Sequence, residues 1–175
     1  GDYLLLQNEI NMLDYIIDQA YEKKMKIIMN PSPFDDKLNT CDLGKIYLFL
    51  LNEIEGEQIT GYKDKDQILY AMAEKFPNAR FVLTLGSDGA VYYDGKEKVF
   101  QDIFEVKAVD TTAAGDTFTG YFIAAVIEDR SVQEALRMAA KASSIAVSRP
   151  GATPSIPAMD EVKGKLGMQD FNKTE

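Results

Sequence analysis

Short segments that are apolar throughout alternate with segments of helical periodicity along the first half of the chain. The apolar segments span residues 4–6, 26–29, 46–51 and 81–83. Strands without polar alternation are typical of a parallel sheet whose two faces are both covered by helices. We therefore predict a single α/β domain over residues 1–175, a three-layer α/β/α sandwich with a mostly parallel sheet.

The composition excludes several kinds of catalysis and partner. The chain of 175 residues has no histidine, which excludes Ser-His-Asp and Cys-His catalysis within it and argues against a zinc site. The net charge of −9, with scattered lysines, argues against binding to a nucleic-acid backbone. No apolar run approaches the roughly 20 residues of a membrane-spanning helix. The single Cys41 cannot form an internal disulfide, which fits a cytoplasmic location.

Residues 109–118 join a short β-branched strand to an amphipathic helix and read Val-Asp-Thr-Thr-Ala-Ala-Gly-Asp-Thr-Phe. Small residues at 113–115 leave the first N–H groups of the helix open to an anion, and the helix dipole adds about half a positive charge there. Asp116 would repel a phosphate at this place unless a hydroxyl lay between them. That conflict predicts a carboxylate that accepts the hydroxyl proton while the N–H groups stabilise a phosphoryl group. An ordinary helix start with an aspartate cap is the alternative.

This segment resembles the C-terminal signature of the ribokinase-type carbohydrate kinases. The resemblance implies that Asp116 is the catalytic base and contacts the substrate, and that the backbone of Ala113, Ala114 and Gly115 forms an anion hole. It also implies the α/β/α fold of that family. The implied reaction is ATP-dependent phosphorylation of a sugar hydroxymethyl group, with D-ribose converted to ribose 5-phosphate.

Two further motifs follow predicted strands, where parallel sheets bind their ligands. Residues 84–89, Thr-Leu-Gly-Ser-Asp-Gly, fit a hairpin turn as well as a nucleotide loop. Residues 52–55, Asn-Glu-Ile-Glu, fit either the acidic start of a helix or an amide and carboxylate pair for Mg²⁺. The resemblance implies magnesium at Asn52 and Glu55. The implied ATP contacts are Asn52, Thr84, Gly86, Ser87, Gly89 and Gly115.

A helix rich in small residues is followed by Pro150, Gly151 and Pro154, which turn backbone carbonyls out of helical pairing. By sequence alone, an ordinary loop after a helix is the favoured interpretation. Residues 145–157 nevertheless resemble the potassium loop of the family. The monovalent-cation ligands implied by that resemblance are Asp110, Thr112, Ala146, Arg149, Gly151 and Ser155.

The resemblance covers nearly the whole chain but not the whole enzyme. Glu9, after the first strand, matches a sugar-contacting residue of the family. The family's N-terminal Gly-Gly sugar motif and β lid have no counterpart here, and the chain opens without an initiator methionine. We therefore expect a piece of a longer enzyme, which holds nucleotide but phosphorylates sugar poorly by itself because water is not excluded and the sugar is not oriented.

Several alternatives stay open. A fructokinase or a 2-keto-3-deoxygluconate kinase of the same family carries similar motifs, and a nucleotide-binding fragment without activity of its own is the rival from a different class. The expected ligands are ATP, Mg²⁺, K⁺ and a sugar, with neither nucleic acid nor membrane as a partner. The resemblance also admits a homodimer of the full-length enzyme.

Overall fold

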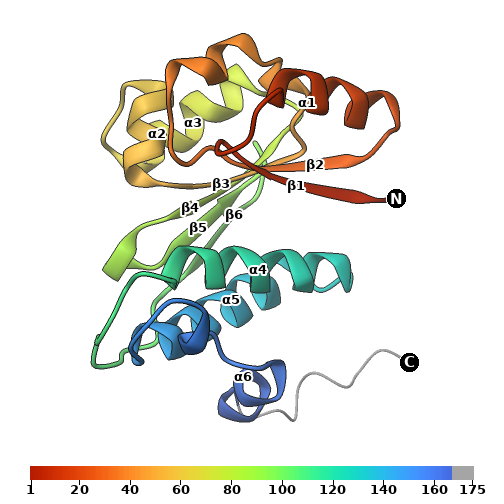
Figure 1. The fold of residues 1–175 in the computed structure, drawn as a ribbon. Helices are drawn as coiled ribbons and strands as arrows, with labels where there is room; N and C mark the ends of the chain where they lie inside the picture. Colours follow the sequence, from red (N-terminus) through yellow and green to blue (C-terminus); the bar gives the residue numbers. More distant parts are fainter. Residues whose placement is uncertain (167–175) are drawn as a thin grey trace. The chain divides into compact units, whose positions relative to one another are not determined.

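The computed structural model describes residues 1–166 (Figure 1). The chain divides into two compact units. The first unit comprises residues 1–86 and 91–99, and the second comprises residues 87–90 and the chain from residue 100 onwards. The single domain predicted over residues 1–175 stays a prediction, and its residues 167–175 lie outside the described part.

Six strands form one sheet, and they follow one another across it in chain order. The first four strands are parallel neighbours. Each of these four ends on a polar residue, so the carboxyl edge of the sheet changes from apolar to polar within one position. The strands are β1 (Tyr3–Gln7), β2 (Lys26–Asn30), β3 (Leu48–Asn52), β4 (Arg80–Thr84), β5 (Ala90–Tyr93) and β6 (Lys98–Gln101).

The predicted strands agree with the observed ones except at two places. The short β-branched strand predicted before Asp110 does not form, because the N–H groups of Val109 and Asp110 donate to the Val147 carbonyl rather than to a neighbouring strand. The second difference is the start of β3. The sequence predicts a strand from residue 46, whereas β3 begins at Leu48. The reason is local: Leu43–Lys45 form a 3₁₀ turn, in which the Asp42 side chain accepts from the Gly44 N–H. The Ile46 N–H then donates to the Leu43 carbonyl at 3.2 Å, which keeps Ile46 in the turn.

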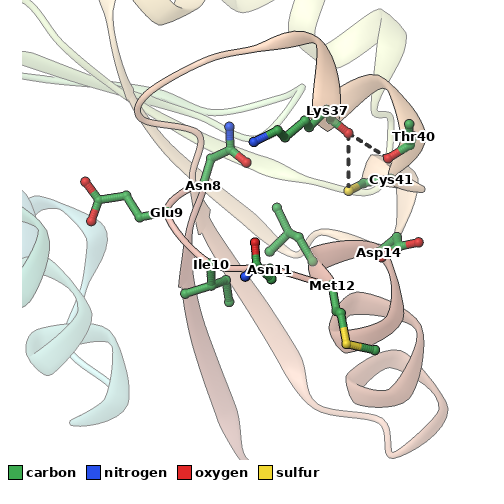
Figure 2. Close-up of a pocket in the computed structure, with 10 residues that line it drawn as sticks. Asn8, Glu9, Ile10, Asn11, Met12, Asp14, Lys37, Thr40 and Cys41 are labelled. Atoms are coloured by element: carbon green, nitrogen blue, oxygen red, sulfur yellow. Dashed lines mark hydrogen bonds between the residues drawn. The ribbon is translucent and has the colours of Figure 1, made fainter.

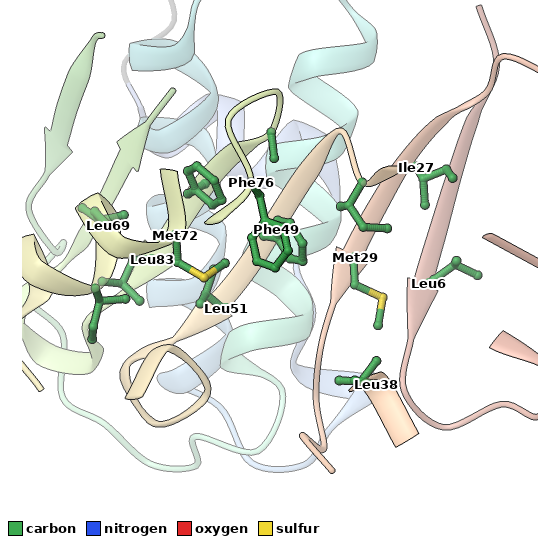
Figure 3. Packing of buried hydrophobic residues seen from close by; sticks show 14 of the residues in the cluster. Leu6, Ile27, Met29, Leu38, Phe49, Leu51, Leu69, Met72, Phe76 and Leu83 are labelled. Carbon is green, nitrogen blue, oxygen red and sulfur yellow. The ribbon is translucent and has the colours of Figure 1, made fainter. Parts of the chain in front are cut away.

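Three helices of the first unit pack on the same side of β1–β4: α1 (Leu13–Glu22), α2 (Glu53–Thr60) and α3 (Lys65–Lys75). Figure 3 shows the buried core between these helices and the strands, with Phe49 at its centre. The Phe49 ring lies 5.9 Å from the Phe81 ring at 11° and 5.1 Å from the Phe76 ring at 30°. Aromatic pairs of this kind add about 0.5–1.5 kcal/mol beyond the area that they bury.

The strand residues that point to the opposite face are buried as well. Ile28, Leu48, Leu50 and Val82 are at most 2% exposed, although they alternate with the side chains of the helix-covered core. Among the parallel strands β1–β4, the departure from this pattern is at the edge strand β1, where Leu5 is 48% exposed. Burial on both faces explains why these strands are apolar throughout, as the sequence predicts.

The second unit is built on a pair of long helices, α4 (Ala114–Ile127) and α5 (Val132–Val147), followed by α6 (Met159–Lys165). On α4, the rings of Phe118 and Phe122 stack at 6.3 Å. Ser131 and Glu134 form a reciprocal capping box at the start of α5, the arrangement that a Ser-x-x-Glu sequence predicts. Within residues 1–166, every helix is too short or too polar to cross a membrane.

Alanine substitutions at two glycines within helices should have opposite effects on stability. A Cβ atom on Gly56 of α2 would lie 2.7 Å from Cγ2 of Ile68, whereas a Cβ atom on Gly120 of α4 would meet nothing within 4 Å. We expect Gly56→Ala to lower the free energy of unfolding by about 1–3 kcal/mol because α2 and α3 must move apart. Gly120→Ala should raise it by about 0.4–1 kcal/mol because the unfolded chain loses entropy. Urea denaturation of both variants measures this, and equal effects would contradict the packing argument.

Candidate active site

The first turn of α4 presents backbone N–H groups to solvent. The N-cap residue, Ala113, supplies no side-chain acceptor. The Ala114 N–H donates to the Thr111 carbonyl at 3.1 Å and the Thr117 N–H donates to the Ala113 carbonyl at 3.0 Å. Between them, the N–H groups of Gly115 and Asp116 have no acceptor within residues 1–166. A Cβ atom on Gly115 would meet nothing within 4 Å, so the space beside this turn is open.

Asp116 lies at this same turn with its side chain exposed to solvent. Within the described residues its carboxylate forms no ion pair, and it does not cap the helix. The aspartate-cap interpretation of this motif is therefore not what the structure shows. The helix start combines free N–H donors with a free carboxylate, which is an arrangement suited to an anion and a hydroxyl together.

Asp110 ties the loop before α4 to the loop after α5. Its Oδ1 accepts from the Thr112 N–H at 2.9 Å and from the Thr112 hydroxyl at 2.6 Å, and its Oδ2 accepts from the Gly151 N–H at 2.9 Å. The Thr112 hydroxyl is the main cause that lowers the pKa of the Asp110 carboxyl below its ordinary value, and the two N–H groups act in the same direction. The predicted cation ligands Asp110, Thr112 and Gly151 thus lie together.

The other predicted cation ligands lie along the end of α5 and the loop after it. The Ala146 carbonyl accepts from the Arg149 N–H at 3.1 Å, and the Ser155 hydroxyl donates to the Ala152 carbonyl at 2.7 Å. The Arg149 guanidinium contacts the carboxylate of Glu161 on α6. Asp110 supplies the carboxylate of the predicted set of cation ligands. Among residues 1–166, the structure shows no group of three or more Asp, Glu, Cys or His side chains that could hold a metal ion.

In the first unit, the predicted nucleotide residues at the ends of β3 and β4 are neighbours. Asn52 and Thr84 are aligned partners in the parallel pair. Asn52 and Glu55 form a capping box at the start of α2, because Asn52 Oδ1 accepts from the Glu55 N–H at 3.0 Å and Glu55 Oε2 accepts from the Asn52 N–H at 2.9 Å. Glu55 Oε1 also accepts from Asn52 Nδ2 at 3.1 Å, and Glu55 is 6% exposed. The helix-start interpretation of this motif is therefore confirmed.

The structure explains the two glycines of residues 84–89 in different ways. Gly86 has a φ of 56° and open space where a Cβ would be, so its backbone is accessible. Gly89 has a φ of 92°, and a Cβ there would lie 2.2 Å from the Gln101 carbonyl oxygen. Gly89 is thus required by a close backbone approach within the second unit. Ser87 lies in the 3₁₀ turn Gly86–Asp88 and is the first residue of that unit.

Glu9 lies at the rim of a polar pocket of about 280 Å³ in the first unit (Figure 2). Figure 2 shows its carboxylate pointing away from Lys37, Thr40 and Cys41. No sequence pattern predicts this pocket, because its walls come from the loop before α1 and from a 3₁₀ turn that follows β2. Burial raises the pKa of the Cys41 thiol, which keeps it protonated. The pocket is lined by Asn8, Glu9, Ile10, Asn11, Met12, Leu13, Asp14, Lys37, Thr40 and Cys41.

The fold and the start of α4 define an α/β protein with an open, uncapped helix N-terminus beside a free carboxylate. Residues 4–159 match the model of the pfkB family of carbohydrate kinases, so the chain belongs to this family. The ribokinase of Haemophilus influenzae is 35% identical over 171 residues, which cover 92% of this chain and 54% of that protein. The ribokinase of Schizosaccharomyces pombe is 33% identical over 180 residues, which cover 95% and 55%.

Solved structures agree with this assignment. Ribokinase from Thermotoga maritima superposes with a TM-score of 0.81 at 32% identity, over 95% of this chain and 57% of that one. Arabidopsis thaliana ribokinase complexed with ribose and ATP superposes with a TM-score of 0.80 at 32% identity, over 94% and 55%. These likenesses confirm the predicted α/β fold of the ribokinase type. The chain spans about half the length of the relatives that it matches.

The contacts of Asp110 predict how its surroundings respond to acid. Because its carboxyl pKa is lowered in the folded chain, its contribution to stability is complete above the ordinary value of 3.8 and is lost as the pH falls through the lower folded value. We expect the amide resonances of Thr112 and Gly151 to titrate together below pH 3.8 in NMR spectra. Asp110→Asn should abolish that titration. A Gly151 amide that titrates at or above the ordinary value would contradict the link.

Proposed function

We propose that this chain forms the catalytic and nucleotide-binding part of an enzyme that transfers the γ-phosphoryl group of ATP to a sugar hydroxymethyl group. The observation that carries the proposal is the first turn of α4, where free N–H groups of Gly115 and Asp116 adjoin an unpaired carboxylate. Membership of a carbohydrate kinase family supports it. D-ribose is the proposed sugar, because the relatives with 33–35% identity are ribokinases and one ribokinase structure holds ribose and ATP.

The proposed phosphoryl transfer follows from the absence of a side-chain cap at the first turn of α4. Asp116 accepts the proton of the attacking sugar hydroxyl, which makes the oxygen a better nucleophile. The N–H groups at the start of α4, with the helix dipole behind them, stabilise the negative charge of the transferring phosphoryl group. The hydroxyl lies between carboxylate and phosphate, which keeps the two negative groups apart. The Ala114 N–H already donates to Thr111, so Gly115 and Asp116 supply the free donors, and Ala113 and Ala114 shape the hole with their small side chains.

Magnesium and potassium are further parts of the proposal. Glu55 accepts two hydrogen bonds from Asn52 in the α2 capping box, and this pair therefore suits the water shell of Mg²⁺ better than direct ligation. Bound there, Mg²⁺ would neutralise phosphate charge. The Asp110 carboxylate, joined by oxygens of Thr112, Ala146, Arg149, Gly151 and Ser155, would hold K⁺ beside the loop that leads into α4. The nucleotide would contact Thr84, Gly86, Ser87 and Gly89.

A second candidate has support of its own. Probable fructokinase-2 of Arabidopsis thaliana is 31% identical over 159 residues, so fructose is the alternative acceptor, with 2-keto-3-deoxygluconate behind it. Glu9 is the proposed sugar contact from this chain. Measurement of phosphorylation rates for D-ribose and D-fructose with the full-length enzyme separates the two candidates. We also propose a cytoplasmic location and a homodimer for that enzyme.

Replacing the proposed base tests the mechanism. In the full-length enzyme, Asp116→Asn keeps the shape of the side chain but removes its ability to take a proton. We expect kcat to fall roughly 10²- to 10⁴-fold while the affinity for ATP changes little. Asp160→Asn, in the first turn of α6, is the control and should leave kcat unchanged. A loss of less than about tenfold for Asp116→Asn would remove this residue from the role of base.

The chain of 175 residues by itself should be a poor sugar kinase. It spans about half the length of its relatives, so we propose that the remaining part orients the sugar and excludes water. A coupled assay of ADP release with D-ribose, ATP, Mg²⁺ and K⁺ measures this. Turnover at about 1 s⁻¹ or faster, the ordinary range of enzymes, would show that this chain is sufficient for activity.

A further inference from the structure

The first turn of α4 is held from outside by the side chain of a serine on α5. Ser143 Oγ donates a hydrogen bond to the carbonyl oxygen of Ala114 at 3.0 Å. Ala114 is the first residue of α4 and directly precedes Gly115 and Asp116. The bond joins residues 29 positions apart in the sequence. It therefore fixes the turn relative to a second helix rather than to the rest of α4.

Neighbouring serines on α5 do not make such a bond. Ser144 Oγ donates to the Lys141 carbonyl at 2.8 Å, and Ser148 Oγ donates to the Ile145 carbonyl at 2.7 Å. Both bonds remain within α5 and its cap, which is the usual arrangement of a serine in a helix. Ser143 differs because its hydroxyl reaches the neighbouring helix at the turn that carries the free N–H groups.

The turn needs support of this kind because it has no cap. A side-chain cap would satisfy the first N–H groups of the helix but would also block them from a phosphate. Without a cap, the first turn of a helix lacks those additional hydrogen bonds and opens more easily. A bond to a carbonyl oxygen restrains the turn and leaves the N–H groups free. Ser143 bonds to the carbonyl side of the turn.

Two backbone contacts place the segment before the turn in the same way. The Val147 carbonyl, at the end of α5, accepts from the Val109 N–H at 2.7 Å and from the Asp110 N–H at 3.2 Å. The segment that leads into α4 is thus bound at Val109 and Asp110 to the end of α5. The first turn of α4 is bound to α5 through Ser143. All of these residues belong to the second unit.

We propose that Ser143 is a positioning residue, which acts through Ala114 to keep the N–H groups of Gly115 and Asp116 directed at the phosphate of the nucleotide. This inference rests on the proposed function of that turn. The competing interpretation is that the Ser143 hydroxyl contributes only to helix packing. Ser144→Ala is the matched control, because it removes an adjacent hydroxyl of the same helix whose bond stays within α5.

The first experiment tests the positioning without any ligand. Hydrogen exchange of the Thr117 amide, which donates to Ala113 within the turn, reports the opening of the turn in the free chain. We expect Ser143→Ala to speed this exchange about fivefold, as the loss of one hydrogen bond implies, and Ser144→Ala to leave it unchanged. Equal exchange in both variants would overturn the proposal whether or not the chain binds nucleotide.

The second experiment measures the consequence for binding. ADP with Mg²⁺ is titrated into the 175-residue chain while the amide resonances of Gly115 and Asp116 are followed by NMR. We expect Ser143→Ala to raise the Kd about three- to tenfold, Ser144→Ala to match the wild type, and Ser143→Thr, which keeps the hydroxyl, to restore tight binding. Equal Kd values for the two alanine variants would overturn the positioning role while leaving the phosphate site intact. An absence of shifts at both amides in the wild type would overturn the proposed function, and the inference with it.

Discussion

The burial of both faces of the parallel strands is the constraint on which the rest of this structure depends. A residue such as Phe49 is covered on the helix side while its neighbours Leu48 and Leu50 are covered on the other, so no position within β3 can be polar. Polar side chains are therefore confined to the strand ends. Because β1–β4 are parallel, these ends meet at one edge, where Gln7, Asn30, Asn52 and Thr84 succeed each other across the sheet. The polar edge at which we propose nucleotide binding is thus a consequence of the way in which the core is closed.

The starts of α2, α5 and α4 differ in whether a side chain caps the helix. At α2 and α5, a side chain and the backbone cap each other reciprocally, with Asn52 and Glu55 in one box and Ser131 and Glu134 in the other. At α4, the first of these two positions holds Ala113, which has no side-chain acceptor, the second holds Asp116, and no side-chain cap is present. A capped start is more stable by about 1 kcal/mol, so the open start of α4 gives up stability at the one turn where free N–H groups are useful. Contacts with α5 compensate for this loss.

The sequence predicts the parts of this structure that depend on short-range patterns. Continuous apolar segments located β1, β2 and β4, and the spacing of Ser131 and Glu134 located the start of α5. The open turn at residues 113–116 could be predicted because small residues have a direct effect on the access to the backbone. Contacts between residues distant in sequence could not be predicted. Nothing in the residue types around Ser143 distinguishes it from Ser144, because only the rotation of α5 against α4 decides which hydroxyl meets Ala114.

The structural and the functional interpretations of one motif need not exclude each other, as Asn52 and Glu55 illustrate. Their capping box uses the Asn52 side-chain oxygen and one hydrogen bond at each carboxylate oxygen of Glu55. A carboxylate has about four acceptor positions, so two remain. The box holds these remaining positions in a fixed orientation at the end of β3, beside Thr84 of β4. A carboxylate that is held in this way loses little further entropy when it binds the water shell of a metal ion. The cap that stabilises α2 thus also preorganises the group proposed to meet magnesium, and one pair of residues serves both purposes.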